Sequence, residues 1–302
     1  MAACGGHRTA LRIVLASLVS VGWLLDPFAV PFMQRALLAV VLLAVAGGVL
    51  GTWVVLRGLS FFTHAVGTAT FPGLVVAGPA GVAPPVAALA AGTGFAALTA
   101  RLAGRRGAGG AGADATVGLL LMGALALGAV LASDVFTSGA GVDQLLFGTL
   151  IGLGAGDVWL AGGVAVGAVG AGAALGRTWL ATGFDPASTR ALGVSGAWGD
   201  RLLLGLLAVA VVAVLPAVGA LLVTTLLAVP AATARLWASS LRGLVRGAIV
   251  VALVDGVSGL LLAWHLDLPP GPAIAVVSGG LFAVVAVGRV LQRRPVSVRE
   301  AV

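Results

Sequence analysis

Long apolar runs without a charged residue constrain the fold of this chain more than any other feature. Residues 36–56, ALLAVVLLAVAGGVLGTWVVL, are one example. An α-helix needs about 20 mostly apolar residues to cross the hydrocarbon core of a bilayer, whereas the strands of a membrane barrel alternate apolar and polar residues. The chain is 60% apolar and 9% charged over 302 residues, which leaves too few charges to cover a soluble surface. These features predict an all-α, polytopic transmembrane helical bundle in a lipid bilayer.

Ten apolar segments follow one another along the chain. They fall at 11–25, 33–56, 60–80, 82–103, 115–133, 157–180, 202–216, 218–234, 244–264 and 272–291. The first ends at Asp26-Pro27, and we interpret residues 1–30 as a signal-anchor-like segment or an extra first span. The segments at 202–216 and 218–234 are short for full spans, and Pro216 indicates a hairpin tip or a kink. We therefore expect eight to ten spans.

The arginines predict the orientation of the bundle. All 17 basic residues are arginine, and 14 of them lie near 57 and in 101–114, 177–201, 235–246 and 289–302. The opposite loops contain one arginine, Arg35, together with five acids: Asp26, Asp134, Asp143, Asp157 and Asp267. Because cytoplasmic loops of membrane proteins carry the excess of positive charge, the arginine side, including the C-terminus, is predicted to be cytoplasmic. The positive charge thus reflects orientation, and no nucleic-acid partner is expected.

Residue types that the chain lacks exclude several chemistries. Without lysine it cannot form a Walker A phosphate loop or a Schiff base. One cysteine, Cys4, permits neither an internal disulfide nor a multi-cysteine metal site. The sequence also contains no HExxH, CxxC or interpretable Ser-His-Asp arrangement. We therefore expect a translocating protein and not an enzyme, and any ATP hydrolysis must take place on another chain.

Glycine, with 47 residues, and alanine are concentrated in the apolar segments. Small side chains let helix backbones approach closely in lipid, so this composition predicts a tightly packed bundle. A bias in genomic composition would produce the same enrichment, as it would the use of arginine in place of lysine.

Polar residues at membrane depth are costly and are therefore candidate functional groups. In LSFFTHAVGTATFPG, residues 59–73, Ser60, His64 and Thr68 share one helix face. Pro72-Gly73 then interrupts or bends the helix and frees backbone carbonyls, where a substrate pathway could pass. A neutral imidazole is a common ligand of transition metals. The alternative is a histidine hydrogen-bonded to a neighbouring helix and a threonine bonded to its own backbone.

Asp255 is the second intramembrane candidate, in the middle of the segment at 244–264. It either lines the pathway or pairs with an arginine or a backbone group inside the bundle. His265 and Asp267, at the outer end of the same segment, are interpreted as a solvated pair, and Asp143 as a solvated residue of an outer loop.

The cytoplasmic stretch at 181–201, ATGFDPASTRALGVSGAWGDR, differs from the other loops. Asp185 suits the N-cap and Pro186 the first position of a short helix, and Gly193 suits its end. A short helix presented to the cytoplasm favours docking to a partner. An ordinary structured loop is the alternative.

Several motifs, in order, resemble one known family. They are PFMQRALLA, GTWVVLRGLSFF, FPG at 71–73, QLLFGTLIGL at 144–153, GFDPASTRALGV, AVGALLVTTLLAVPAATARL at 217–236 and LDLPPGPAIAVVSG at 266–279. From about Pro31 to Val290 the chain resembles the permease subunits of ABC-3 importers, which take up zinc, manganese or iron. The resemblance implies a type II ABC importer permease domain over residues 31–302.

The same resemblance implies partners and a mechanism. The permease would form a homodimer in the bacterial cytoplasmic membrane, with a cytoplasmic ATPase dimer and an extracellular solute-binding protein. ATP-driven alternating access would move a divalent metal, with no tightly bound cofactor. The segment that couples the permease to the ATPase would include Phe184, Asp185, Arg190, Ala191 and Gly193.

Three positions depart from the family pattern. The family usually carries an aspartate and a histidine four residues apart where this chain has His64 and Thr68, and an acid where it has Thr149. A cation site would then have one strong ligand per subunit, so either two His64 side chains meet on the dimer axis or the cargo is a metal chelate or another substrate. A stand-alone secondary transporter or channel is the other class considered, with Asp255 as its one clear intramembrane acid.

Overall fold

The computed structural model describes residues 26–104, 111–135, 148, 153–184, 196–219 and 222–292. The helices are η1 (Asp26–Ala29), α3 (Pro31–Leu56), α4 (Ser60–Ala69), α5 (Phe71–Ala77), α6 (Pro84–Gly104), α7 (Ala111–Val130), η2 (Leu131–Val135), α9 (Ala155–Phe184), α11 (Gly196–Val218), α12 (Val223–Leu227), α13 (Val229–Arg235), α14 (Leu241–Leu266) and α15 (Pro270–Gln292). No strand occurs in these ranges. The predicted all-α bundle is confirmed.

Eight helical segments in the described ranges are long and apolar enough to cross a membrane, with α4 and α5 counted together as Ser60–Ala77. This number lies within the expected eight to ten. The apolar segment at 11–25 lies outside the described residues, so its role as a signal anchor or extra span stays a prediction.

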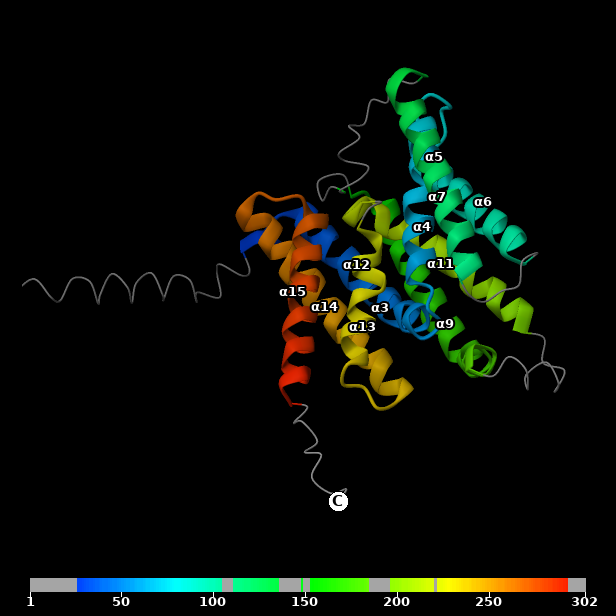
Figure 1. Cartoon of the computed structure of the whole chain (residues 1–302). Helices are drawn as coiled ribbons and strands as arrows, with labels where there is room; N and C mark the ends of the chain where they lie inside the picture. Colours follow the sequence, from blue (N-terminus) through cyan, green and yellow to red (C-terminus); the bar gives the residue numbers. More distant parts are fainter. Residues whose placement is uncertain are drawn as a thin grey trace, which may run out of the picture.

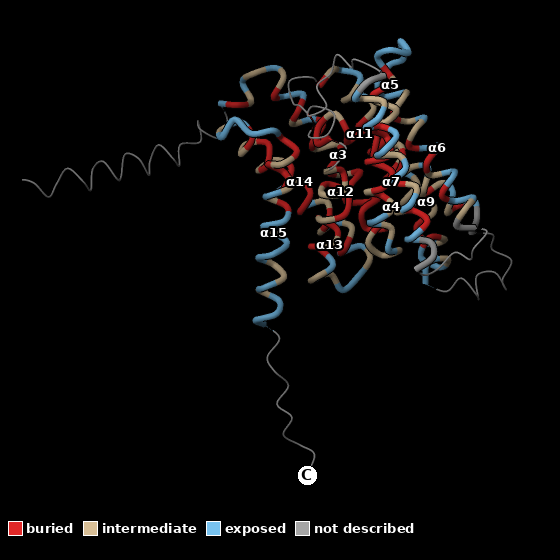
Figure 2. Tube along the Cα trace, turned by 45° about the horizontal axis from the view of Figure 1, so that its top comes forward, coloured by how far each residue is buried: buried red, intermediate tan, exposed pale blue. Residues whose placement is uncertain are grey.

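Helix α3 forms the centre of the bundle. It packs against α14 and α9 along much of its length and also contacts α11, α12 and α13. Helices α4 to α7 form a neighbouring group, and α15 lies at the opposite edge (Figure 1). Burial follows this arrangement, because α3 and α12 are mostly buried whereas α15 exposes much of its length (Figure 2). The exposed apolar side chains of α15 suit contact with lipid or with another apolar surface.

Glycines set the closest helix contacts, as the small-residue composition predicts. A Cβ atom on Gly48 of α3 would lie 2.7 Å from the backbone nitrogen of Ile249 in α14. A Cβ on Gly259 of α14 would lie 2.6 Å from the Cα of Ile274 in α15. Both distances are shorter than a carbon side chain tolerates, so only glycine permits these crossings.

The segment expected at 218–234 is not one span but two short helices, α12 and α13. Pro230, the second residue of α13, has no N–H to donate to the carbonyl of Leu226, and this interrupts the helix. The preceding helix, α11, runs through Pro216 to Val218, so Pro216 is not a hairpin tip. The chain turns just after it at Gly219, which has a φ of +84°.

Candidate functional site

The candidate pathway helix is interrupted where Pro72 predicts. Helix α4 ends at Ala69 and α5 begins at Phe71. Because Pro72 has no N–H, the carbonyl of Thr68 lacks its usual donor four residues on. At the junction, the hydroxyl of Thr70 donates to the carbonyl of Gly67 at 2.6 Å. The backbone N–H of Thr70 turns to the carbonyls of Gly67 and Thr68 instead, so the interruption replaces the regular helix pattern with local bonds inside this candidate span.

The polar face of α4 becomes more buried along the helix. Ser60 is exposed, His64 is half-buried and Thr68 is 1% exposed. The hydroxyl of Thr68 donates to the backbone carbonyl of His64 at 3.0 Å, which is the local bonding considered as an alternative from the sequence. On this face His64 thus remains the side chain with the chemistry of a transition-metal ligand.

No three or more His, Cys, Asp or Glu side chains cluster as a metal site within the described ranges. On the face of Ser60, His64 and Thr68, the described chain supplies a single imidazole. A multidentate site that uses this face therefore needs ligands from a second molecule or from the cargo itself.

Asp255 lies at the contact between α14 and α15, and within the described ranges it forms no ion pair with an arginine. Its side chain is 1% exposed, and its Oδ2 accepts a 2.7 Å hydrogen bond from the hydroxyl of Ser278 in α15. Its Oδ1 is buried and has no hydrogen-bond partner among the described residues. In the single chain Asp255 therefore joins two helices through a serine that the sequence did not single out.

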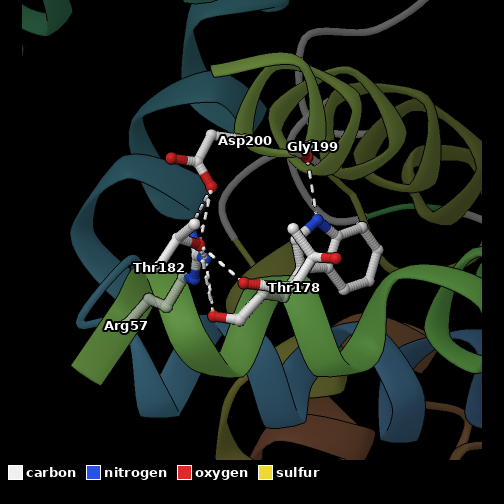
Figure 3. Close-up of polar contacts among 6 residues, drawn as sticks. Arg57, Thr178, Thr182, Gly199 and Asp200 are labelled. Atoms are coloured by element: carbon white, nitrogen blue, oxygen red, sulfur yellow. Dashed lines mark hydrogen bonds and ion pairs between the residues drawn. The ribbon is translucent and has the colours of Figure 1, made fainter. Parts of the chain in front are cut away.

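Three helix ends meet at Arg57, directly after α3 (Figure 3). The guanidinium donates through Nη1 to Oδ1 of Asp200 in α11 at 2.6 Å, and through Nη2 to the carbonyl of Trp179 in α9 at 2.7 Å. Nη2 also donates to the hydroxyl of Thr182. We call Arg57, Trp179, Thr182, Gly199 and Asp200 the Arg57 bracket. The sequence placed Arg57 on the cytoplasmic side, but no local pattern paired it with an acid 143 residues away.

The predicted ATPase-coupling residues are only partly described. Phe184 is the last residue of α9, and its side chain is 68% exposed. Asp185, Arg190, Ala191 and Gly193 lie outside the described residues, as does Thr149. The short helix expected there stays a prediction.

The fold and the interrupted α4–α5 helix define a polytopic helical membrane protein with polar groups at membrane depth. Residues 29–289 match the ABC 3 transport family. The chain belongs to this family, and it is therefore a membrane-spanning translocation subunit of the ABC importer class.

Individual relatives agree over most of the chain. It is 29% identical over 259 residues to the manganese transport system membrane protein MntC of Halalkalibacterium halodurans, covering 84% of this chain and 86% of that protein. It is 31% identical over 283 residues to the chelated iron transport system membrane protein YfeD of Yersinia pestis, covering 90% and 89%. The solved structure of PsaBC from Streptococcus pneumoniae in complex with Fab matches with a TM-score of 0.76 and 25% identity, over 87% of this chain and 94% of that chain.

Proposed function

We propose that this permease imports a divalent metal ion, zinc or manganese, by ATP-driven alternating access. The observation that carries the proposal is the position of His64, half-buried on the polar face of α4 and preceding the helix interruption. A neutral imidazole binds such cations, and discontinuous helices often form substrate sites in transporters. The relatives named for manganese and chelated iron transport support a metal cargo.

The ATPase that drives transport and the remaining partners are proposed to be separate chains. A permease without lysine cannot use a Walker A loop, so a cytoplasmic ATPase dimer would supply the energy. Two copies of the permease would bring two His64 side chains to a shared pathway, and an extracellular solute-binding protein would deliver the cargo. The arginine-rich loops support a cytoplasmic C-terminus in a bacterial cytoplasmic membrane.

A chelated metal is the second candidate cargo. It is favoured by the commitment of the Thr68 hydroxyl to the backbone of its own helix, which leaves one strong ligand per chain on this face. A chelate brings its own ligands and needs fewer from the protein. Uptake of free Mn²⁺ or Zn²⁺, compared with uptake of the same metals in chelated form, distinguishes the two cargoes.

The test uses proteoliposomes that contain the permease, its ATPase and its binding protein. His64→Ala should abolish ATP-driven uptake of metal while the complex still assembles, because the substitution removes the imidazole from the pathway. Ser60→Ala, on the exposed end of the same face, is the matched control and should transport normally. Unchanged uptake by His64→Ala would remove this residue from the pathway. Uptake by the permease alone would instead indicate a secondary transporter or channel.

A further inference from the structure

We propose that Arg57 is a positioning residue that couples the facing ends of α9 and α11 to the start of α4. The Arg57 bracket would transmit a displacement of those two ends to the helix that carries His64. This inference rests on the proposed ATP-driven function, because that function requires motion at the cytoplasmic side to reach the pathway.

One guanidinium joins three helices. Arg57 follows α3 directly, and its backbone N–H donates to the carbonyl of Trp53 at 3.0 Å. Its side chain is 13% exposed and contacts α9 and α11 through the hydrogen bonds given above. The planar guanidinium presents several donors in a fixed arrangement, whereas a lysine ammonium is a single mobile point charge. Its charge-assisted hydrogen bond to Asp200 is also stronger than a hydrogen bond between neutral groups.

Helices α9 and α11 are also joined independently of Arg57. The indole Nε1 of Trp179 donates to the carbonyl of Gly199 at 2.8 Å. The Trp179 ring, which is fully buried, meets the Trp53 ring of α3 edge-on at a centroid distance of 5.4 Å. The hydroxyl of Thr182 approaches Oδ1 of Asp200 at 3.4 Å. The hydrogen bonds to Gly199 and Asp200 hold the ends of α9 and α11 together, so a displacement of one is shared with the other.

The connection from Arg57 to the pathway helix α4 is short. Gly58 adopts a φ of +67°, and the N–H of Leu59 returns to the carbonyl of Val54 at 2.8 Å. Helix α4 then begins at Ser60, and His64 lies one turn further on. Only Arg57, Gly58 and Leu59 separate the end of α3 from α4, and the Leu59–Val54 hydrogen bond ties this corner to α3, so in our proposal a shift of Arg57 reaches α4 across a short connection.

The Arg57 bracket lies next to the predicted ATPase-coupling segment in the sequence. The ends that it joins, Phe184 of α9 and Gly196 of α11, flank residues 185–195. Those residues belong to the segment expected to contact the ATPase. A force applied there must act on α9, on α11 or on both, and each is bonded to Arg57.

The experiment measures coupling rather than activity alone. In the assembled complex, Arg57→Ala should lower the amount of metal transported per ATP hydrolysed by about tenfold, within the range of typical coupling energies. Asp200→Asn should lower it less, because Arg57 keeps its bonds to Trp179 and Thr182. Arg201→Ala is the matched control, because Arg201 is the exposed neighbour of Asp200 and should leave the ratio unchanged.

A readout that does not depend on the cargo separates this inference from the proposed function. With Cys4 replaced by serine, Phe61→Cys places a thiol on the exposed side of α4. Its labelling rate should change on addition of a non-hydrolysable ATP analogue, and Arg57→Ala should abolish that change. If the α4 thiol responds to nucleotide but no metal is transported, the proposed metal cargo is refuted, whereas the proposed role of the Arg57 bracket is not.

Two results would overturn the role of Arg57. One is a normal transport ratio in Arg57→Ala, and the other is a nucleotide response of the α4 thiol that survives the substitution. If Arg57→Ala does not assemble, Arg57→Lys and Asp200→Asn decide the question by the same two readouts. Normal coupling in both would assign the bracket a purely structural role.

Discussion

The hydroxyl of Thr68 donates to the backbone carbonyl of His64, one turn earlier on the same helix, at a distance of 3.0 Å. The two residues thus lie on one helix face but differ in what their side chains contact. The hydroxyl of Thr68 is hydrogen-bonded within its own helix, whereas the imidazole of His64 is half-buried.

Replacement of Thr68 by valine should be tolerated. Valine has nearly the same shape and loses only a hydrogen bond from a side chain to its own helix backbone, which contributes about 1 kcal/mol or less. Metal uptake should stay within about twofold of the native rate, because the hydroxyl is not offered to the cargo. The measurement is ATP-driven uptake in proteoliposomes. A loss as large as that of His64→Ala would show that the hydroxyl contacts the substrate.

Replacement of Thr68 by histidine should strengthen a site for free divalent metal. It adds a second imidazole one turn from His64, and spacing of i and i+4 places both on one face. We expect a lower KM for Zn²⁺ and a reduced preference for a chelated metal, measured by uptake competition. The matched control is Ser60→His, also one turn from His64 but at the exposed end of the face. Equal effects of the two substitutions would contradict a site at the depth of Thr68.

Asp255→Asn should preserve transport. The amide keeps an oxygen for the hydroxyl of Ser278, and hydrogen bonds between membrane helices contribute only about 0.6 kcal/mol on average. Asp255→Ala should instead lower the thermal stability of the purified complex, because it leaves a cavity beside an unsatisfied hydroxyl. Thermal unfolding and uptake are measured on both variants. Abolished uptake in a stable Asp255→Asn complex would show that Asp255 lines the substrate pathway.

Gly51→Ala should destabilise the bundle by about 1–3 kcal/mol or more, because overpacking forces the backbone apart. A Cβ atom on Gly51 of α3 would overlap the carbonyl oxygen of Leu227, at the end of α12. The control is Gly170→Ala in α9, where a Cβ meets no atom within 4 Å. Thermal unfolding of the two variants in the same detergent checks the difference. Similar melting temperatures would show that α12 shifts to accept the methyl group.

The features predicted well from the sequence are those set by local composition. The apolar runs gave the spans, and Pro72 gave the interruption after α4, because a missing N–H acts on its own helix. The segment at 218–234 was predicted less well, because its apolar length alone does not show that Pro230 divides it into α12 and α13. A hydropathy profile does not detect the loss of one backbone hydrogen bond.

The side-chain pairs could not be predicted because their partners are distant in the chain. Ser278 is one of several small polar residues in its helix, and nothing in its spacing links it to Asp255. From the sequence alone, Arg57 indicates only the orientation of the bundle. Its partners are known only once α9 and α11 are packed against α3. The helix crossing order, and not the local pattern, decides which of the polar residues meet.

The glycine face of α3 has a consequence for biosynthesis. Gly47 and Gly51 fit against the carbonyl oxygens of Leu226 and Leu227, about 180 residues later in the chain, and at typical synthesis rates this separation corresponds to roughly 10 seconds or more. During that interval α3 is already in the bilayer while the segment that covers it is still on the ribosome. These glycine positions therefore face lipid or the insertion machinery until α12 arrives. The packing around α3 is completed later still, when α14 has been synthesised and has packed against it.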